Sequence, residues 1–194
     1  MKKILIFVLL LCNTSLVFSQ SKERTNTMGL DIRLIRNSNI EALNINYNLT
    51  FKRHNISVGP LFNMYPLLDL TDPPSNYPFW GMNIAYSFFP NKSLYFLDLY
   101  FFIDFQFVSM SDDSESLKFF NSKNDYIFQP SLGYSFNAYL TKKHNLYLLH
   151  RIGLGYYYRY SKFDNYRNSY LAGLLSLGLG YNVLFIKKET RKDE

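Results

Sequence analysis

The chain has 194 residues, a formal charge of +6 and a pI near 9.2, and 19% of its residues are aromatic. This length fits one domain. Nine glycines, seven prolines and one cysteine exclude collagen-like, disordered and disulfide-scaffold classes. After the N-terminus no apolar run reaches the ~18 residues that a membrane-spanning helix needs, so helical membrane proteins are excluded as well.

The first 19 residues have the form of a secretory signal peptide. A basic start at residues 2–3 precedes an apolar run at 4–11, and small side chains allow cleavage after Ser19. Cleavage leaves 175 residues (194 − 19) with a charge of +4 (6 − 2) and no cysteine, so disulfides and thiol catalysis are excluded. Lipoprotein processing at Cys12 is disfavoured because Leu11 is too large for that cut.

From position 28 onward, apolar residues recur at every second position, which indicates β-strands rather than helices. In the second stretch, for example, Leu43, Ile45 and Tyr47 alternate with asparagines. Turn-forming residues separate eight such stretches. They cover residues 28–34, 42–52, 56–63, 81–88, 97–107, 126–137, 146–159 and 171–185.

The volumes of the two alternating sets predict which face of a closed barrel each one occupies. One set is mainly Leu, Ile, Phe and Tyr, whereas the other holds eight of the nine glycines together with Ala, Ser and Asn. Eight strands enclose an interior only just wide enough for side chains, so the small set belongs inside. A surface of glycine and serine would also gain little from water, so we expect the bulky set to face lipid.

The lengths of the connections favour a membrane barrel. Three links are short, namely 53–54, 90–92 and 141–143, and three are long, namely 65–77, 109–125 and 161–167. These two kinds alternate along the chain, as do the periplasmic turns and extracellular loops of outer-membrane barrels. The first outer link, 37–39, is a short exception. We therefore expect both termini in the periplasm.

Aromatic residues are expected to form a girdle at each membrane interface. The outer girdle would contain Trp80, Phe107, Tyr126 and Tyr158, and the inner one Phe51, Phe88 and Phe185.

The last stretch contains Gly180-Tyr181-Asn182-Val183-Leu184-Phe185, which is similar to the Gly-x-x-apolar-x-aromatic terminal-strand signal of outer-membrane barrels. With the alternation over residues 28–186, the chain resembles the small eight-stranded outer-membrane barrels of the OmpX and OmpA transmembrane-domain type. The resemblance implies an all-β fold, an eight-stranded antiparallel up-and-down transmembrane β-barrel. It also implies assembly by the barrel assembly machinery through Gly180, Val183 and Phe185.

Charged residues of the small set are expected to pair inside the barrel. They are Asp31, Arg33, Lys52, Asp98, Asp104, Arg151 and Arg159, four positive and three negative. An unpaired buried charge costs several kcal/mol, so a compensated network that packs the interior is favoured over a proton or ion pathway. The strand count disfavours an open porin channel.

The histidines give weak signals for chemistry. His150 falls in the lipid-facing set, and barrel-type lipid A deacylases use an outward His with a Ser two residues along the strand, but that position is Ile152 here. We expect His150 to be neutral near the inner interface, or turned inward by a bulge. His54 and His144 lie in turns without a nearby carboxylate or cysteine, so no metal site is expected.

Two of the long loops have distinctive compositions. Asp112, Asp113 and Glu115 lack the ligand spacing and the turn glycine of a calcium loop, so a solvated loop is favoured. The loop 65–77 contains three leucines and three prolines, which favours a lid over the barrel mouth above a partner-binding surface.

Pro60 and Pro130 lie inside predicted strands, where each removes a backbone donor. We expect β-bulges or nearer strand ends at these positions.

The predicted organisation is a signal peptide (1–19), an outer-membrane barrel domain (20–186) and a charged periplasmic tail (187–194). We expect a non-enzymatic role in envelope structure or surface contact through the loops, without cofactors, since the sequence carries no phosphate loop, nucleophile elbow or HExxH motif.

The expected partners are outer-membrane lipid and lipopolysaccharide. Nucleic acid is not among them, because the positive charge is divided among lumen, loops and tail. The alternatives are an outer-membrane enzyme that modifies lipid A, a narrow conduit for small apolar molecules, and a soluble periplasmic carrier.

Overall fold

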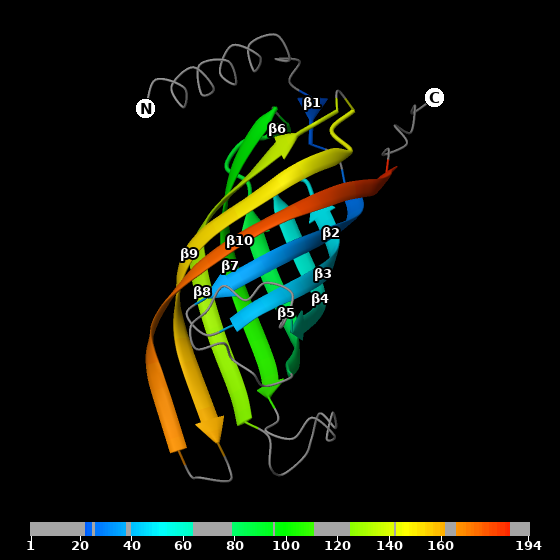
Figure 1. The fold of residues 1–194 in the computed structure, drawn as a ribbon. Helices are drawn as coiled ribbons and strands as arrows, with labels where there is room; N and C mark the ends of the chain where they lie inside the picture. Colours follow the sequence, from blue (N-terminus) through cyan, green and yellow to red (C-terminus); the bar gives the residue numbers. More distant parts are fainter. Residues whose placement is uncertain are drawn as a thin grey trace, which may run out of the picture.

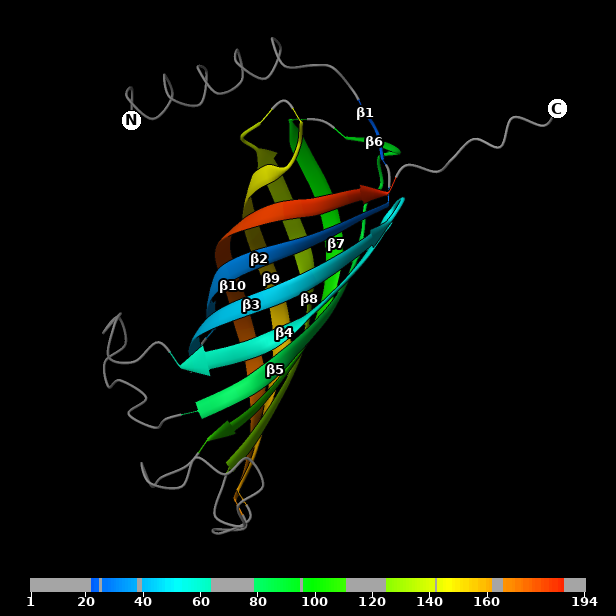
Figure 2. The ribbon, with the colours of Figure 1, turned by 90° about the vertical axis from the view of Figure 1, so that its right-hand side faces the viewer.

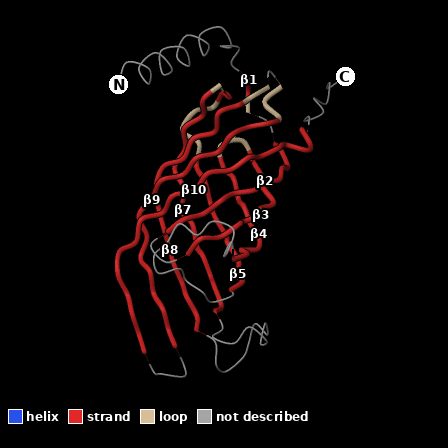
Figure 3. The backbone as a smooth tube through the Cα atoms, in the orientation of Figure 1, coloured by secondary structure: helices blue, strands red, loops and turns tan. Residues whose placement is uncertain are grey.

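The computed structural model describes residues 22–24, 26–37, 40–63, 79–94, 96–110, 125–141, 143–161 and 166–186. Nearly all of these residues belong to strands (Figure 3). The predicted signal peptide and tail lie outside the described residues, as do most residues of the three predicted long loops. In the described part of the chain, no helix is long and apolar enough to cross a membrane.

Eight antiparallel strands close into one barrel in the order β10-β2-β3-β4-β5-β7-β8-β9 (Figures 1 and 2). The strands are β2 (Asn26–Asn37), β3 (Ile40–Phe51), β4 (His54–Asn63), β5 (Phe79–Phe88), β7 (Leu97–Met110), β8 (Asp125–Tyr139), β9 (Leu146–Ser161) and β10 (Tyr166–Ile186). Each predicted stretch corresponds to one of these strands. The predicted eight-stranded antiparallel barrel is therefore confirmed.

The barrel has two different ends. The turn end carries the turn Lys52–Arg53 and the connections 89–96 and 140–145, and Asn26 pairs there with Ile186, so the first and last barrel residues meet. The opposite end, called the loop end here, is where the strands stop at the undescribed segments. The strands β8, β9 and β10 reach furthest toward the loop end (Figure 1).

The register of the strands determines their tilt. The register partner of Thr27 on β3 has its own partner on β4, and so on from strand to strand around the barrel. This chain of partners returns to β2 at Asn37, so one circuit shifts the register by ten residues (37 − 27). Eight strands with this offset are tilted by roughly 40° from the barrel axis. At that tilt, the outward residues of β7 from Leu97 to Phe107 span about 25 Å along the axis, the height of the apolar band of outer-membrane barrels.

The bulky alternating residues lie on the outside of the barrel. Ile45, Phe101 and Leu177 are 38%, 48% and 53% exposed. Their chain neighbours on the inward face, Asn46, Phe102 and Ser176, are buried. The burial of β2 alternates residue by residue along the strand. The prediction that the small set faces inward is confirmed.

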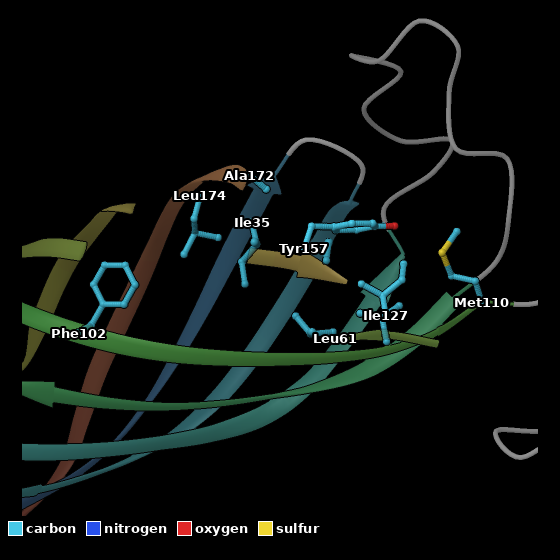
Figure 4. Close-up of a cluster of buried hydrophobic side chains, with 10 residues drawn as sticks. Ile35, Leu61, Phe102, Met110, Ile127, Tyr157, Ala172 and Leu174 are labelled. Carbon is cyan, nitrogen blue, oxygen red and sulfur yellow. The ribbon is translucent and has the colours of Figure 1, made fainter. Parts of the chain in front are cut away.

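The interior is less uniformly polar than the sequence predicts. A buried apolar cluster fills its loop-end part (Figure 4): Ile35, Ala42, Leu61, Phe102, Val108, Met110, Ile127, Tyr157, Ala172 and Leu174. A second cluster, made of Leu94, Tyr139, Tyr147 and Leu149, lies toward the turn end. The prediction of a packed polar lumen is therefore only partly right. Small polar residues alone would leave voids, and close packing requires larger apolar side chains on the inward phase.

Both strand prolines are accommodated without a bulge. Pro60 keeps its pair with Met82 on β5, and Pro130 keeps its pair with Phe105 on β7. On their other sides the pairing with β3 and β9 is interrupted and then resumes in the same register. A strand residue directs its N–H toward one neighbour only, so proline disturbs one ladder. The amide of Asn44 donates to the carbonyl oxygen of Pro60 at 2.9 Å. The prediction of bulges or nearer strand ends at the prolines is wrong.

A small second sheet at the turn end was not predicted. The strand β1 (Lys22–Glu23) pairs antiparallel with β6 (Ser93–Leu94), which lies between β5 and β7 in the chain (Figure 1). This pairing brings the residues before the barrel against its turn end.

Candidate functional site

The charged side chains of the interior form small groups, and Asp31 is the centre of the most complete one. Arg33, two residues along β2, forms an ion pair with Asp31 at 2.5 Å, and its Nη2 donates to the carboxylate at 2.6 Å. Asn46 and Asn48 on β3 donate to the same carboxylate at 3.0 and 2.6 Å. Because Asp31 and Arg33 are each only 1% exposed, these bonds replace the lost hydration of both charges.

A second group is centred on Asp104 of β7. Asn83 on β5 and Gln106 on β7 donate to its carboxylate, the latter at 2.9 Å. Arg151 on β9 lies 4.0 Å from Asp104, and its guanidinium lies over the ring of Phe102 at 4.9 Å. Arg151 is therefore held by an aromatic face and a distant carboxylate rather than by a close ion pair.

The third group closes the turn end of the interior. Arg24, which lies between β1 and β2, forms a buried ion pair with Asp98 at the start of β7. Its Nε donates to the carbonyl oxygen of Asn91 at 2.8 Å, and its guanidinium lies 4.1 Å from the centre of the Phe89 ring. A side chain from outside the barrel strands thus compensates a buried strand carboxylate.

The structure places six of the seven predicted lumen charges in such contacts. Arg159 pairs with Asp125 near the loop end. Lys52 is the exception: it lies exposed in the turn between β3 and β4, with a φ of 53°. The prediction that Lys52 points into the lumen is wrong, because the chain reverses at this residue and the strand alternation ends at Phe51.

Arg24 and Asp125 were not among the predicted lumen residues. Asp125 precedes Tyr126 on the inward phase of β8, so one further step of the alternation would have found it. Arg24 follows no strand periodicity, and nothing in the alternating pattern indicates it. The excess of positive charges in the predicted set, four against three, indicates a missing acidic partner, and Asp125 is such a residue. With both residues included and Lys52 removed, these contacts join four arginines and four aspartates.

A small cavity lies among the described interior residues toward the turn end. It measures about 40 Å³, and its lining includes Arg24, Asp31, Arg33, Tyr100 and Arg151. A polar space of this size holds a few water molecules. It is far smaller than the roughly 300–1,000 Å³ of a typical small-molecule site.

The predicted terminal signal has an irregular backbone. The β10–β2 register shifts between Asn182 and Leu184, so Val183 has no partner in β2, and Phe185 pairs with Thr27. The side chains of Val183 and Phe185 lie outside the described residues. Gly180 pairs with Tyr147, and a Cβ on Gly180 would lie 2.1 Å from the tyrosine ring.

Replacing Gly180 by Ala is expected to destabilise the barrel by about 1–3 kcal/mol, because the buried Tyr147 ring would have to move. Gly173→Ala is the matched control on the same strand, since a Cβ there meets nothing within 4 Å. Urea unfolding of both variants in detergent measures the difference. Equal stability of the two variants would contradict the packing described for Gly180.

His150 lies on the outward face, where its ring stacks on Phe136 at 4.9 Å. Its register neighbours are Phe136 on β8 and Leu177 on β10, and the pairing is continuous, so no bulge turns it inward. His54 begins β4, and its Nδ1 lies 2.6 Å from the hydroxyl of Tyr86. His144 lies in the β8–β9 turn with its ring edge against Tyr139.

Aromatic residues gather at both ends of the outer face. Phe51, His54 and Phe88 are register neighbours at the turn end. Toward the loop end, Trp80 pairs with Phe62, and Phe107 packs on Phe128 at 4.9 Å between ring centres.

In the described ranges, no three His, Cys, Asp or Glu side chains come together in a way that could hold a metal ion. Asp112, Asp113, Glu115 and the leucines of loop 65–77 lie outside those ranges.

No protein-family model and no curated protein sequence matches this chain. Among solved structures, the N-terminal β-barrel domain of OprF from Pseudomonas aeruginosa is similar, with 11% identity over 84% of this chain and 100% of that one, at a TM-score of 0.51. Neisserial surface protein A (NspA) has 13% identity over 84% and 99% of the two chains, with a TM-score of 0.49. A major outer membrane protein from Thermus thermophilus has 13% identity over 82% and 100%, with a TM-score of 0.39.

The similarity to the OprF domain establishes the fold of this chain. It has the eight-stranded barrel fold found in outer-membrane proteins, as the sequence resemblance predicted.

Proposed function

We propose that this chain is an outer-membrane β-barrel with a non-enzymatic role in envelope structure or surface contact, made through its loop end. One observation carries the proposal: a closed barrel has its exposed bulky residues outside, in a band about 25 Å high, and its charges paired inside. Such an exterior is stable in contact with lipid, whereas an apolar surface of this extent would cause the protein to aggregate in water. The turn end, where the barrel begins and ends, faces the periplasm.

Two features argue against catalysis by this barrel. The interior cavity of about 40 Å³ has no room for a substrate. On the outer face, the register neighbours of His150 are Phe136 and Leu177, and neither offers a nucleophile or an acid. Mass spectrometry of lipid A from a deletion strain is therefore expected to show the parental species, and a changed acylation or phosphorylation pattern would overturn the non-enzymatic role.

A conduit along the barrel axis is also disfavoured. The apolar cluster fills the loop-end part of the interior, and the Arg24–Asp98 pair lies across the turn end. We expect no steady conductance when the purified barrel is inserted into planar lipid bilayers. A persistent ohmic conductance would show a continuous water path and contradict the closed interior.

Membrane fractionation combined with heat-modifiable gel mobility tests the location. The chain is expected in the outer-membrane fraction, and it should migrate faster before boiling than after, because the intact barrel resists unfolding by detergent. Recovery in the aqueous fraction without detergent would favour the soluble carrier instead.

A further inference from the structure

A groove on the outer face has a more specific lining than the general apolar band. It lies near the loop end on β7–β10, has a volume of about 560 Å³, and is walled by Phe107, Tyr126, Phe128, Tyr158, Tyr160 and Arg167. This volume falls within the range of small-molecule sites, whereas the interior cavity does not. The groove therefore has the size of a ligand site.

The chemistry of the groove changes along the barrel axis. Phe107, Phe128 and Tyr158 are register neighbours and form an aromatic floor, with Phe105 stacked near Phe128 at 6.3 Å between ring centres. Two residues nearer the loop end, Tyr126, Tyr160 and Arg167 form the next register row. The first row offers mainly apolar surface, and the second offers hydroxyl groups and a positive charge.

Arg167 brings a positive charge to the groove. Its side chain is exposed, its guanidinium lies 5.9 Å from the centre of the Tyr160 ring, and no carboxylate pairs with it among the residues that the structure describes. By contrast, the outward Arg36 is paired with Glu41 at 3.2 Å. A guanidinium matches the geometry of a phosphate group and can bind it through two parallel hydrogen bonds.

The level of the groove in the proposed membrane fits a lipid. Phe107 marks the loop-end limit of the apolar band of about 25 Å, and Tyr160 and Arg167 lie beyond it toward the loop end, on the headgroup side of the band. We propose that the groove binds a phosphorylated outer-leaflet lipid, with an acyl chain on the Phe107–Phe128 floor and a phosphate at Arg167. This inference rests on the outer-membrane placement proposed above.

Native mass spectrometry of the folded barrel, titrated with lipid A and with dephosphorylated lipid A, tests the site. Arg167→Gln is expected to weaken lipid A binding about tenfold and to leave binding of the dephosphorylated lipid unchanged. Phe128→Ala is expected to weaken binding of both lipids, because it removes the floor of the groove. Lys92→Gln is the matched control, since it removes an exposed positive charge at the turn end.

The outcomes separate the two proposals. Every variant is first checked for heat-modifiable mobility, and failure of the parent chain to behave as a detergent-soluble barrel would overturn the membrane placement itself. If the parent is a folded barrel but Arg167→Gln binds lipid A as tightly as the parent or the Lys92→Gln control does, the lipid site is wrong. Equal binding of lipid A and its dephosphorylated form by the parent would also overturn it, and would leave the groove as an apolar contact surface.

Discussion

Replacing Asp31 by Asn is expected to destabilise the folded barrel by about 3–5 kcal/mol, because the change leaves Arg33 as a buried charge without its carboxylate. Arg33 is 1% exposed and pairs directly with Asp31, and Asn46 and Asn48 orient that carboxylate. The chain has one tryptophan, Trp80, so its fluorescence reports unfolding in urea from a single position.

A double-mutant cycle separates the ion pair from other effects of the substitution. The Asp31→Asn, Arg33→Met double variant is expected to be more stable than the sum of the two single changes predicts, because it removes both charges together. Arg36→Gln serves as the control, since its pair with Glu41 is half-exposed and worth about 0–1 kcal/mol. If Asp31→Asn cost no more than Arg36→Gln, the interior would be hydrated rather than packed.

Replacing Leu177 by Arg is expected to cost about 2–4 kcal/mol in a lipid bilayer, because the charge would lie near the middle of the apolar band. Leu177 is exposed and stands midway among the outward residues of β10, between Leu171 and Tyr181. Its register neighbours, Leu34 and His150, provide no counter-charge. Unfolding in lipid vesicles, followed by Trp80 fluorescence, measures the loss.

Leu97→Arg is the matched control for this effect. Leu97 has similar exposure but begins β7 at the turn end, where an arginine can reach the headgroup region at a cost of about 0–1 kcal/mol. Equal costs at the two positions would contradict a membrane that surrounds the middle of the barrel.

The strands and their faces could be read from the sequence because the alternation is a local signal. Along residues 42–51, for example, small residues, three of them asparagines, alternate with bulky residues without interruption, so both the strand and its inward face follow from the order of the residues. The narrow interior of eight strands then decides which set lies inside. Neighbouring strands pair in chain order, and the pairing of β10 with β2 closes the barrel.

The partners of the interior charges could not be read in the same way. Asp98 is compensated by Arg24, which lies outside the alternating pattern, and Asp31 is oriented by asparagines that look like simple small fillers in the sequence. The contacts of Asp31 depend on the register between β2 and β3, which pairs Asp31 directly with Asn46. Arg24 reaches Asp98 because the segment before the barrel folds against its turn end, where β1 pairs with β6. For Lys52 the local pattern predicts the wrong side, because the alternation ends at Phe51 and Lys52 lies in the turn that follows.

Spin labels at paired positions test the central claim most directly. Single cysteines at Ile45, Phe101 and Leu177, and at their inward neighbours Asn46, Phe102 and Ser176, would be labelled in the chain from residue 20 onward and reconstituted into vesicles. We expect labels at the first three positions to collide with oxygen dissolved in the lipid and to be shielded from a water-soluble nickel complex, whereas labels at the other three should be largely inaccessible to both. Oxygen collisions that favour positions 46, 102 and 176, or free access of the nickel complex to positions 45, 101 and 177, would contradict a barrel with its bulky residues in lipid.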